Sequence, residues 1–197
     1  MDLRDLPQFR VLDVEAGREP GETRVAGVFS HVRGVRNDLG YLYRSDGPSI
    51  IAVLDAVPSA AGERVTLLTS DASLARELRP GVSFPWLDCY WRPYHLAMVL
   101  GPADRWARLA FGAEPAHFFE LGGVQGWHPV GGPLPDDAVD LGVRAGAWDH
   151  EHCELCRASI GGGGAAEGYV DPDKYWLCVA CYERYAARRD ISFALEE

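Results

Sequence analysis

Four cysteines near the C-terminal end of the sequence have the spacing of a metal site. They form two Cys-x-x-Cys pairs, Cys153 with Cys156 and Cys178 with Cys181, and 21 residues lie between the pairs. Two residues between cysteines let one tight turn aim both sulfurs at a single point, about 2.3 Å from a zinc ion. The pairs therefore predict a structural Zn²⁺ ion bound by four thiolates. Such a site leaves no coordination position for water, so the ion is not expected to be catalytic.

The separation between the pairs is slightly longer than the usual range of about 15 to 20 residues. The glycine tract 161–164 accounts for the difference, because it is typical of a flexible surface excursion. Without those four glycines, 17 of the 21 residues remain, and this number is within the usual range.

The four cysteines allow other chemistries besides zinc binding. Disulfides need an oxidising compartment, but the start MDLRDLPQFR lacks the apolar core of a signal peptide, and a fifth cysteine, Cys89, is left over. Iron is compatible with four thiolates, whereas a redox-active Cys-x-x-Cys fits two chelating pairs less well. The nearby His150 and His152 leave three alternatives: replacing a cysteine as a ligand, bonding to a ligand, or being exposed polar residues.

The order of elements around the cysteines resembles treble-clef zinc modules. A strand at 169–170, a turn at 171–173, a returning strand at 175–177 and a helix at 182–189 are expected. More narrowly, the segment resembles small uncharacterised bacterial proteins that carry W-D-H-x-H-C-x-x-C, then G-Y and W-x-C-x-x-C-Y. The matching positions are Trp148, Asp149, His150, His152, Cys153, Cys156, Gly168, Tyr169, Trp176, Cys178, Cys181 and Tyr182. This resemblance implies a zinc site and no reaction.

Short strands are expected throughout the first hundred residues. Their ranges are 9–14, 24–32, 39–44, 49–57, 64–69 and 94–100, with turn residues between them. This spacing predicts a closed or partly closed β-barrel, interrupted by one helix at 72–79 that Asp71 would cap.

The expected barrel resembles the second, β-barrel domain of translational GTPases such as elongation factor Tu. The matching stretches are 9–14, 23–27, 34–38, 50–57, 65–68 and 78–81. The resemblance implies an association with RNA or the ribosome. No nucleotide hydrolysis follows from it, because the sequence contains no G-x-x-x-x-G-K-[ST].

The stretch 82–101 is the most aromatic part of the chain and also contains Cys89 and His95. A cysteine and a histidine can form a nucleophile and its base, which gives an enzyme as one alternative. No third orienting group is visible, so a buried, unreactive cysteine is favoured. The aromatic side chains are expected either to pack in the barrel or to form a binding patch.

Helices are expected at 102–112 and 114–121, and the second would place His117 and Glu120 on one turn as a weak candidate metal pair. The Gly- and Pro-rich stretch 122–147 predicts a loose connector, with Trp127 holding it in place. The expected fold class is therefore α+β and mostly β. Its parts are a barrel-like domain at 1–121, a connector at 122–147 and a treble-clef zinc module at 148–197.

The composition of the chain limits the classes of partner and the location that can be expected. The formal net charge is −10, and only one lysine, Lys174, is present among 19 basic residues, which disfavours nucleic acid as a partner. No apolar run approaches membrane-spanning length, and a cytoplasmic location is expected. The sequence therefore predicts a non-catalytic zinc-binding protein that acts as a protein-interaction module. The surfaces expected to bind are Tyr169, Tyr175 and Trp176 in the zinc module and the aromatic run around Trp91.

Overall fold

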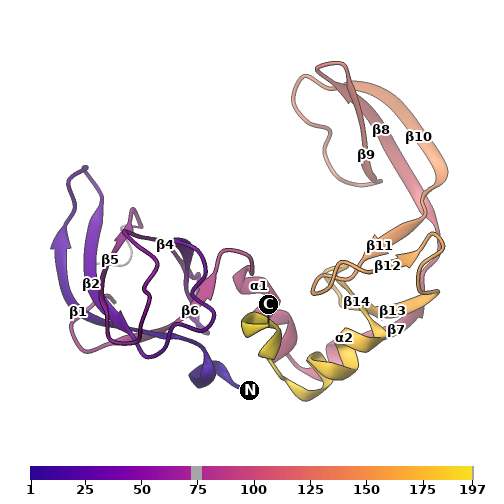
Figure 1. The fold of residues 1–197 in the computed structure, drawn as a ribbon. Coiled ribbons are helices and arrows are strands. Elements are labelled where there is room, and N and C mark those ends of the chain that lie inside the picture. The colour runs from indigo at the N-terminus through magenta and orange to yellow at the C-terminus, as the bar shows by residue number, and fades with distance from the viewer. Residues whose placement is uncertain (72–76, 197) are drawn as a thin grey trace. The chain divides into compact units, whose positions relative to one another are not determined.

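The chain divides into two compact units in the computed structural model, which describes residues 1–71 and 77–196 (Figure 1). The first unit contains Met1–Gly101 and the C-terminal residues from Tyr185 onward, and the second contains Pro102–Arg184. The domains expected from the sequence group the residues differently, at 1–121, 122–147 and 148–197. That each of these ranges folds as an independent domain stays a prediction.

A closed barrel of six antiparallel strands forms the first unit, which confirms the barrel expected from the sequence. The strands follow one another around the barrel in the order β1, β2, β5, β4, β3, β6. Their bounds are β1 (Gln8–Ala16), β2 (Thr23–Phe29), β3 (Leu39–Leu42), β4 (Ile50–Leu54), β5 (Arg64–Thr69) and β6 (Ser83–Asp88).

The barrel core is built by side chains that alternate along each strand. In β4, Ile50 points inward while its neighbour Ile51 is exposed, as the two-residue period of a strand requires. Edge-to-face contacts join the rings of Phe29 and Trp86, whose centroids lie 5.6 Å apart. The Trp86 ring lies directly on the backbone of Gly40, where a Cβ atom would collide with it. Only glycine allows this approach of strand and ring.

The sixth barrel strand is β6, and the prediction of a strand at 94–100 is wrong. Those residues belong to helix α1 (Pro93–Leu100), which buries His95, Leu96, Met98 and Val99. A short, wholly apolar run does not distinguish a buried strand from a buried helix. Pro93 is compatible with the observed helix, because its fixed φ angle suits the first turn and its missing N–H costs nothing there.

The aromatic stretch around α1 is mostly core. Trp86 and Trp91 are buried, whereas Tyr90 is 73% exposed. The ring of Trp91 also packs edge-to-face on Phe193 at 5.0 Å, in the C-terminal 3₁₀ turn Ser192–Leu195.

The expected helix at 72–79 falls mainly on residues 72–76, which lie outside the described residues. Beyond them, Leu78 belongs to the barrel core. Within the part of the chain that is described, no helix combines the length and the apolar character needed to cross a bilayer.

The second unit contains three small antiparallel sheets. β8 lies between β10 and β9, β11 pairs with β12, and β13 lies between β14 and β7. The bounds are β7 (Ala107–Ala110), β8 (Glu114–Leu121), β9 (Val124–Pro129), β10 (Val139–Trp148), β11 (His150–His152), β12 (Ser159–Gly161), β13 (Glu167–Val170) and β14 (Trp176–Cys178). Helix α2 (Val179–Arg184) follows β14 directly, so the helix expected at 182–189 begins three residues earlier and continues as the 3₁₀ turn Ala186–Arg188.

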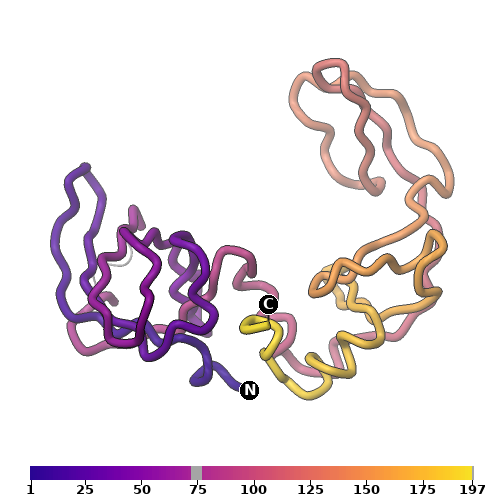
Figure 2. The backbone as a smooth tube through the Cα atoms, in the orientation of Figure 1, coloured from indigo at the N-terminus to yellow at the C-terminus, as the bar shows by residue number. Residues whose placement is uncertain are grey.

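The helices expected at 102–112 and 114–121 and the loose connector at 122–147 are wrong. Strand β7 and the 3₁₀ turn Ala103–Arg105 occupy the first range, β8 fills the second, and β9 and β10 run through the third. The backbone passes from β8 through a tight turn into β9 and returns by a longer loop to β10 (Figure 2). Gly122 and Gly123, both with positive φ, form the two-residue hairpin turn.

A buried carboxylate anchors the loop before β3 to the end of β6. Asp88 is 2% exposed and accepts hydrogen bonds from the backbone N–H groups of Arg36 and Asn37, each at 2.9 Å. The side-chain amide of Asn37 donates to the other carboxylate oxygen. Because buried donors without acceptors are costly, this residue holds the loop in place.

We expect Asp88→Ala to lower the free energy of unfolding by about 2 to 4 kcal/mol, because the backbone N–H groups of Arg36, Asn37 and Tyr90 and the side-chain amide of Asn37 would lose a buried acceptor. Urea unfolding followed by the fluorescence of buried tryptophan measures this loss. The control is Asp46→Ala, which removes a carboxylate that is 80% exposed and is expected to cost less than about 1 kcal/mol. Equal effects of the two substitutions would contradict the anchoring role.

Candidate metal centre

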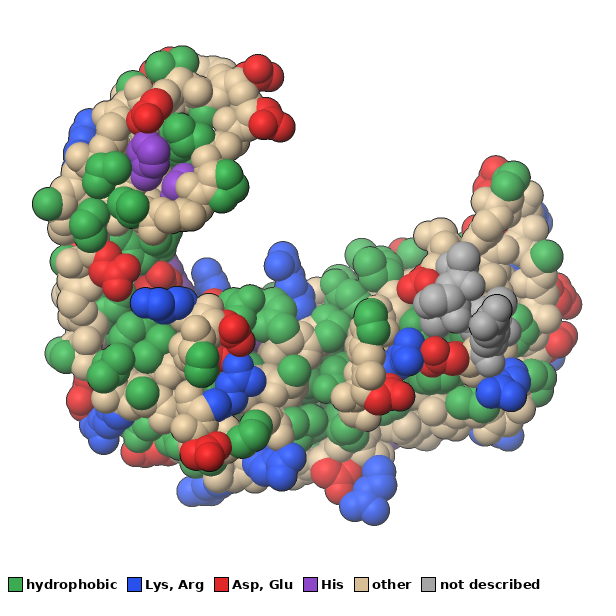
Figure 3. Space-filling view, turned by 180° about the vertical axis from the view of Figure 1, so that it is seen from behind, with side chains coloured by type: hydrophobic (Ala, Val, Ile, Leu, Met, Phe, Trp, Pro, Cys, Tyr) green, Lys and Arg blue, Asp and Glu red, His purple; other side chains and the backbone are tan. Residues whose placement is uncertain are grey.

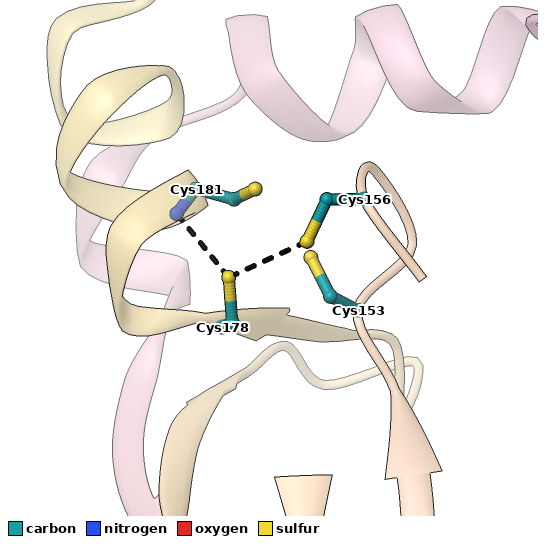
Figure 4. Close-up of side chains that lie close together, drawn as sticks. All are labelled: Cys153, Cys156, Cys178 and Cys181. Carbon is teal, nitrogen blue, oxygen red and sulfur yellow. Dashed lines mark hydrogen bonds between the residues drawn. The ribbon is translucent and has the colours of Figure 1, made fainter. Parts of the chain in front are cut away.

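The sulfur atoms of Cys153, Cys156, Cys178 and Cys181 all lie within 4.8 Å of one another. Figure 4 shows the first two on the turn between β11 and β12 and the last two at the end of β14 and in α2. The sulfurs of Cys156 and Cys178 are 3.7 Å apart. In a tetrahedron with metal–sulfur bonds of about 2.3 Å, the sulfurs are separated by about 3.8 Å. The group can therefore hold a metal ion, and the four cysteines expected to meet do meet.

The first Cys-x-x-Cys turn is shaped by backbone hydrogen bonds. The N–H of Arg157 donates to the carbonyl of Cys153 at 2.8 Å, and Arg157 has a φ of 62°. The backbone N–H groups of Cys178, Cys156 and Leu155, in that order of effect, lower the pKa of the Cys153 thiol. These donors favour the thiolate form that a metal requires.

The second turn presents its sulfurs in a similar way. Cys178 ends β14, and the N–H of Cys181 donates to the Cys178 sulfur at 3.4 Å. Cys181 lies in the first turns of α2 and is buried. The step from strand to helix thus points both sulfurs to the same side.

The thiols of the cluster differ in their pKa values. A hydrogen bond from Cys181 lowers the pKa of Cys153 to about 5, whereas burial raises the pKa of Cys178 to about 11. The pKa of Cys181 is raised, first by its hydrogen bond to Cys153 and then by burial. Four thiolates cannot gather at this spacing without a cation, because their mutual repulsion and burial oppose ionisation. The donor set therefore fits a divalent, thiophilic metal ion.

Asp171 fixes the hairpin that delivers Cys178. Its side chain is 1% exposed and accepts hydrogen bonds from the N–H groups of Asp173 and Tyr175, each at 3.0 Å. The guanidinium of Arg105 pairs with it at 2.7 Å. The turn expected at 171–173 is confirmed, and the ion pair of Asp171 with Arg105 is an addition from the tertiary structure.

His150 and His152 lie next to the cysteines without joining their cluster. Both belong to β11, and the Nδ1 atom of His150 lies 2.7 Å from a carboxylate oxygen of Asp149. Among the described residues, the metal-binding group contains four cysteines and no histidine.

The environment of Cys89 disfavours a catalytic role. Burial, followed by the neighbouring Asp88, raises the pKa of the Cys89 thiol, and a neutral thiol is a poor nucleophile. The Nδ1 atom of His95 accepts a hydrogen bond from the N–H of Arg92 at 3.0 Å.

The expectation that His117 and Glu120 share one turn is wrong. They are three residues apart on strand β8, so their side chains point to opposite faces. His117 instead bonds Asp140 at 2.8 Å.

Sequence reasoning missed a cleft of about 460 Å³ in the second unit. The residues that line it are Phe118, Trp127, Ala147, Trp148, Asp149, His150 and His152. The stretch 122–147 was expected to be a connector, so its tryptophan was not placed on a strand. The Gly-Gly pair between two apolar runs is the signal that identifies the hairpin.

Comparison with protein-family models, curated proteins and solved structures found no match to this chain.

We expect Asp171→Ala to destabilise the second unit by about 3 kcal/mol, because the substitution leaves two N–H donors and a partly buried guanidinium without their acceptor. Hydrogen exchange at the amides of β13 and β14 in the metal-loaded protein measures this loss locally. Asp173→Ala is the matched control: it removes a carboxylate that also pairs with Arg105, at 3.1 Å, but is 69% exposed. It should cost less than about 1 kcal/mol, and a larger effect for Asp173 than for Asp171 would refute the assignment.

Proposed function

We propose that the protein binds one structural zinc ion through Cys153, Cys156, Cys178 and Cys181, and that the second unit presents surfaces for binding another protein. The observation that carries the metal part is the convergence of four sulfurs within 4.8 Å. Zinc accepts four thiolates in a tetrahedron and needs no further ligand.

The chain order supports a treble-clef module. A turn with two cysteines comes first, the hairpin β13–β14 follows, and α2 carries the last cysteine. In this arrangement the ion joins the turn to the hairpin and helix, which have few apolar contacts of their own. The reduced thiols suit a reducing compartment such as the cytoplasm.

A structural role is favoured over a catalytic one. All four coordination positions would be filled by protein sulfurs, so none remains for water or substrate. The ion would act by fixing the second unit, and its loss would change binding through unfolding.

The apolar surface of the second unit supports the binding role. Large apolar side chains there are at least 37% exposed: Leu109, Leu121, Val124, Trp127, Val130, Val139, Leu141, Val143 and Tyr175. Exposed apolar groups gathered in one region are typical of interaction surfaces. Of the residues expected to bind, Tyr175 is exposed, whereas Tyr169 stacks on Tyr182 with centroids 3.5 Å apart.

We expect the unchanged chain to bind one zinc ion. The Cys153→Ser variant should bind none, because a serine hydroxyl at this buried position replaces one of the four thiolates. Elemental analysis combined with native mass spectrometry measures the metal and its stoichiometry. Cys89→Ser is the matched control, since Cys89 lies outside the cluster, and it should retain full zinc. A metal-free native protein, or one that binds iron alone, would overturn the zinc assignment.

Removal of the ion with a chelator is expected to unfold the second unit and leave the barrel folded, because the barrel has its own core. Hydrogen exchange should rise at least about 100-fold at β13 and β14 while β2 and β5 stay protected. Equal loss of protection in both units would argue against a separately stabilised module.

We expect Tyr175→Ala to weaken binding of a protein partner at least about fivefold, since tyrosine is a frequent anchor of interfaces. Quantitative affinity purification with the zinc-loaded chain measures the recovered partner. Val57→Ala alters an equally exposed apolar residue of the barrel unit and should leave recovery unchanged. Unchanged recovery with Tyr175→Ala would exclude the hairpin surface as the binding site.

A further inference from the structure

The cleft of the second unit, called here the aromatic cleft, has walls of aromatic rings. Phe118 on β8 and Trp127 on β9 are direct cross-strand partners, and their rings stack with centroids 5.9 Å apart and planes at 22°. Trp127 is 55% exposed. Trp148 is held by a hydrogen bond from its indole N–H to Glu151 at 2.7 Å. The rings are thus ordered by the protein and still offer their faces to a ligand.

The chain segment that supplies the lining of the aromatic cleft is acidic. Asp149 is part of its lining, and the segment 114–152 contains seven acidic side chains and one arginine. The acidic residues are Glu114, Glu120, Asp136, Asp137, Asp140, Asp149 and Glu151. Figure 3 shows acidic, histidine and apolar side chains together on this part of the surface. This charge attracts a cation and repels a phosphate backbone.

The protein already places a guanidinium on the same ring pair. The guanidinium carbon of Arg144 lies 4.2 Å from the centroid of the Phe118 ring. Arg144 is not among the residues that line the aromatic cleft. Its position demonstrates that arginine stacking is compatible with the geometry of this ring pair, and the face of Trp127 offers a second such place.

We propose that the aromatic cleft binds an arginine side chain of a partner protein. Arginine fits both features of the lining, because its planar guanidinium stacks on aromatic faces and donates in pairs to a carboxylate. Asp149 bonds His150 through one oxygen and retains further acceptor positions. The volume of about 460 Å³ is sufficient for one such side chain and its flanking backbone. The inference rests on the proposed protein-binding function and supplies the chemistry of the partner.

The test uses the full, zinc-loaded chain and N-acetyl-arginine-methylamide as the probe. The indole N–H signals of Trp127 and Trp148 should shift in nuclear magnetic resonance spectra, with a dissociation constant on the order of millimolar for so small a ligand. N-acetyl-citrulline-methylamide has nearly the same shape and no charge, and should bind about tenfold more weakly. Equal binding of the two probes, or no shift of either indole, would overturn the proposal.

Two substitutions locate the site. Trp127→Leu and Asp149→Asn should each weaken binding of the arginine probe about fivefold, because one removes the ring face and the other the charge. Tyr90→Leu and Asp46→Asn, which change an exposed aromatic ring and an 80% exposed carboxylate of the barrel unit, should bind as the unchanged chain does. If Trp127→Leu disturbs the fold, Asp149→Asn, with the same side-chain shape, decides the outcome alone.

Metal analysis of the same samples separates the two claims. A chain with one zinc ion that does not bind the probe retains the proposed zinc site and loses the aromatic cleft as an arginine site. A chain without zinc overturns the metal proposal instead. Stronger binding of an oligouridine than of the arginine probe at the two indoles would replace the protein partner with RNA and refute the inference.

Discussion

Repulsion among four sulfur atoms is the constraint on which the second unit depends. Its elements bring four cysteines within 4.8 Å, where burial and like charge prevent all of them from ionising without a cation. Few other groups can stabilise this unit, because within residues 102–184 the buried apolar side chains are few, and two of them are cysteines of the cluster. They are Trp106, Ala116, Cys153, Leu155, Ile160, Leu177 and Cys181. A core of this size gives little free energy against the entropy of ordering the chain, so a metal ion is the expected source of stability.

The barrel unit is stabilised in a different way. Its six strands close on themselves and leave no unpaired sheet edge, and the rings of Phe9, Phe29 and Trp86 fill the interior. The buried carboxylate of Asp88 then fixes a loop that apolar burial alone would not hold. One chain therefore combines a unit stabilised by its core with a unit whose stability, under the proposed zinc binding, would depend on the ion. The supply of metal ions would then control the folding of the second unit, while the barrel unit stays folded.

The small core of the second unit also explains why so much apolar surface remains outside. Sheet β10–β8–β9 buries Ala116 but leaves Trp127, Val139 and Val143 more than half exposed. Exposed side chains of this kind are available for a ligand, and one of them, Trp127, lines the aromatic cleft together with Asp149. The proposed arginine site lies next to the proposed zinc site along the chain, because His152 of the cleft lining directly precedes Cys153.

The sequence by itself determined the four-cysteine cluster, the barrel and five of its strands, because spacing within a turn and two-residue alternation are local properties. It also assigned Asp171 to the hairpin turn. Only the tertiary structure decided that 94–100 is a helix, since an apolar run of that length satisfies either conformation. The tertiary structure was also needed to identify strand β8 and the cleft beside Trp127. The helix expected at 114–121 was outweighed by hydrogen bonds to β9 and β10. The Gly-Gly pair signals the turn to β9, but no local pattern encodes the pairing with β10, whose residues lie up to 34 positions away.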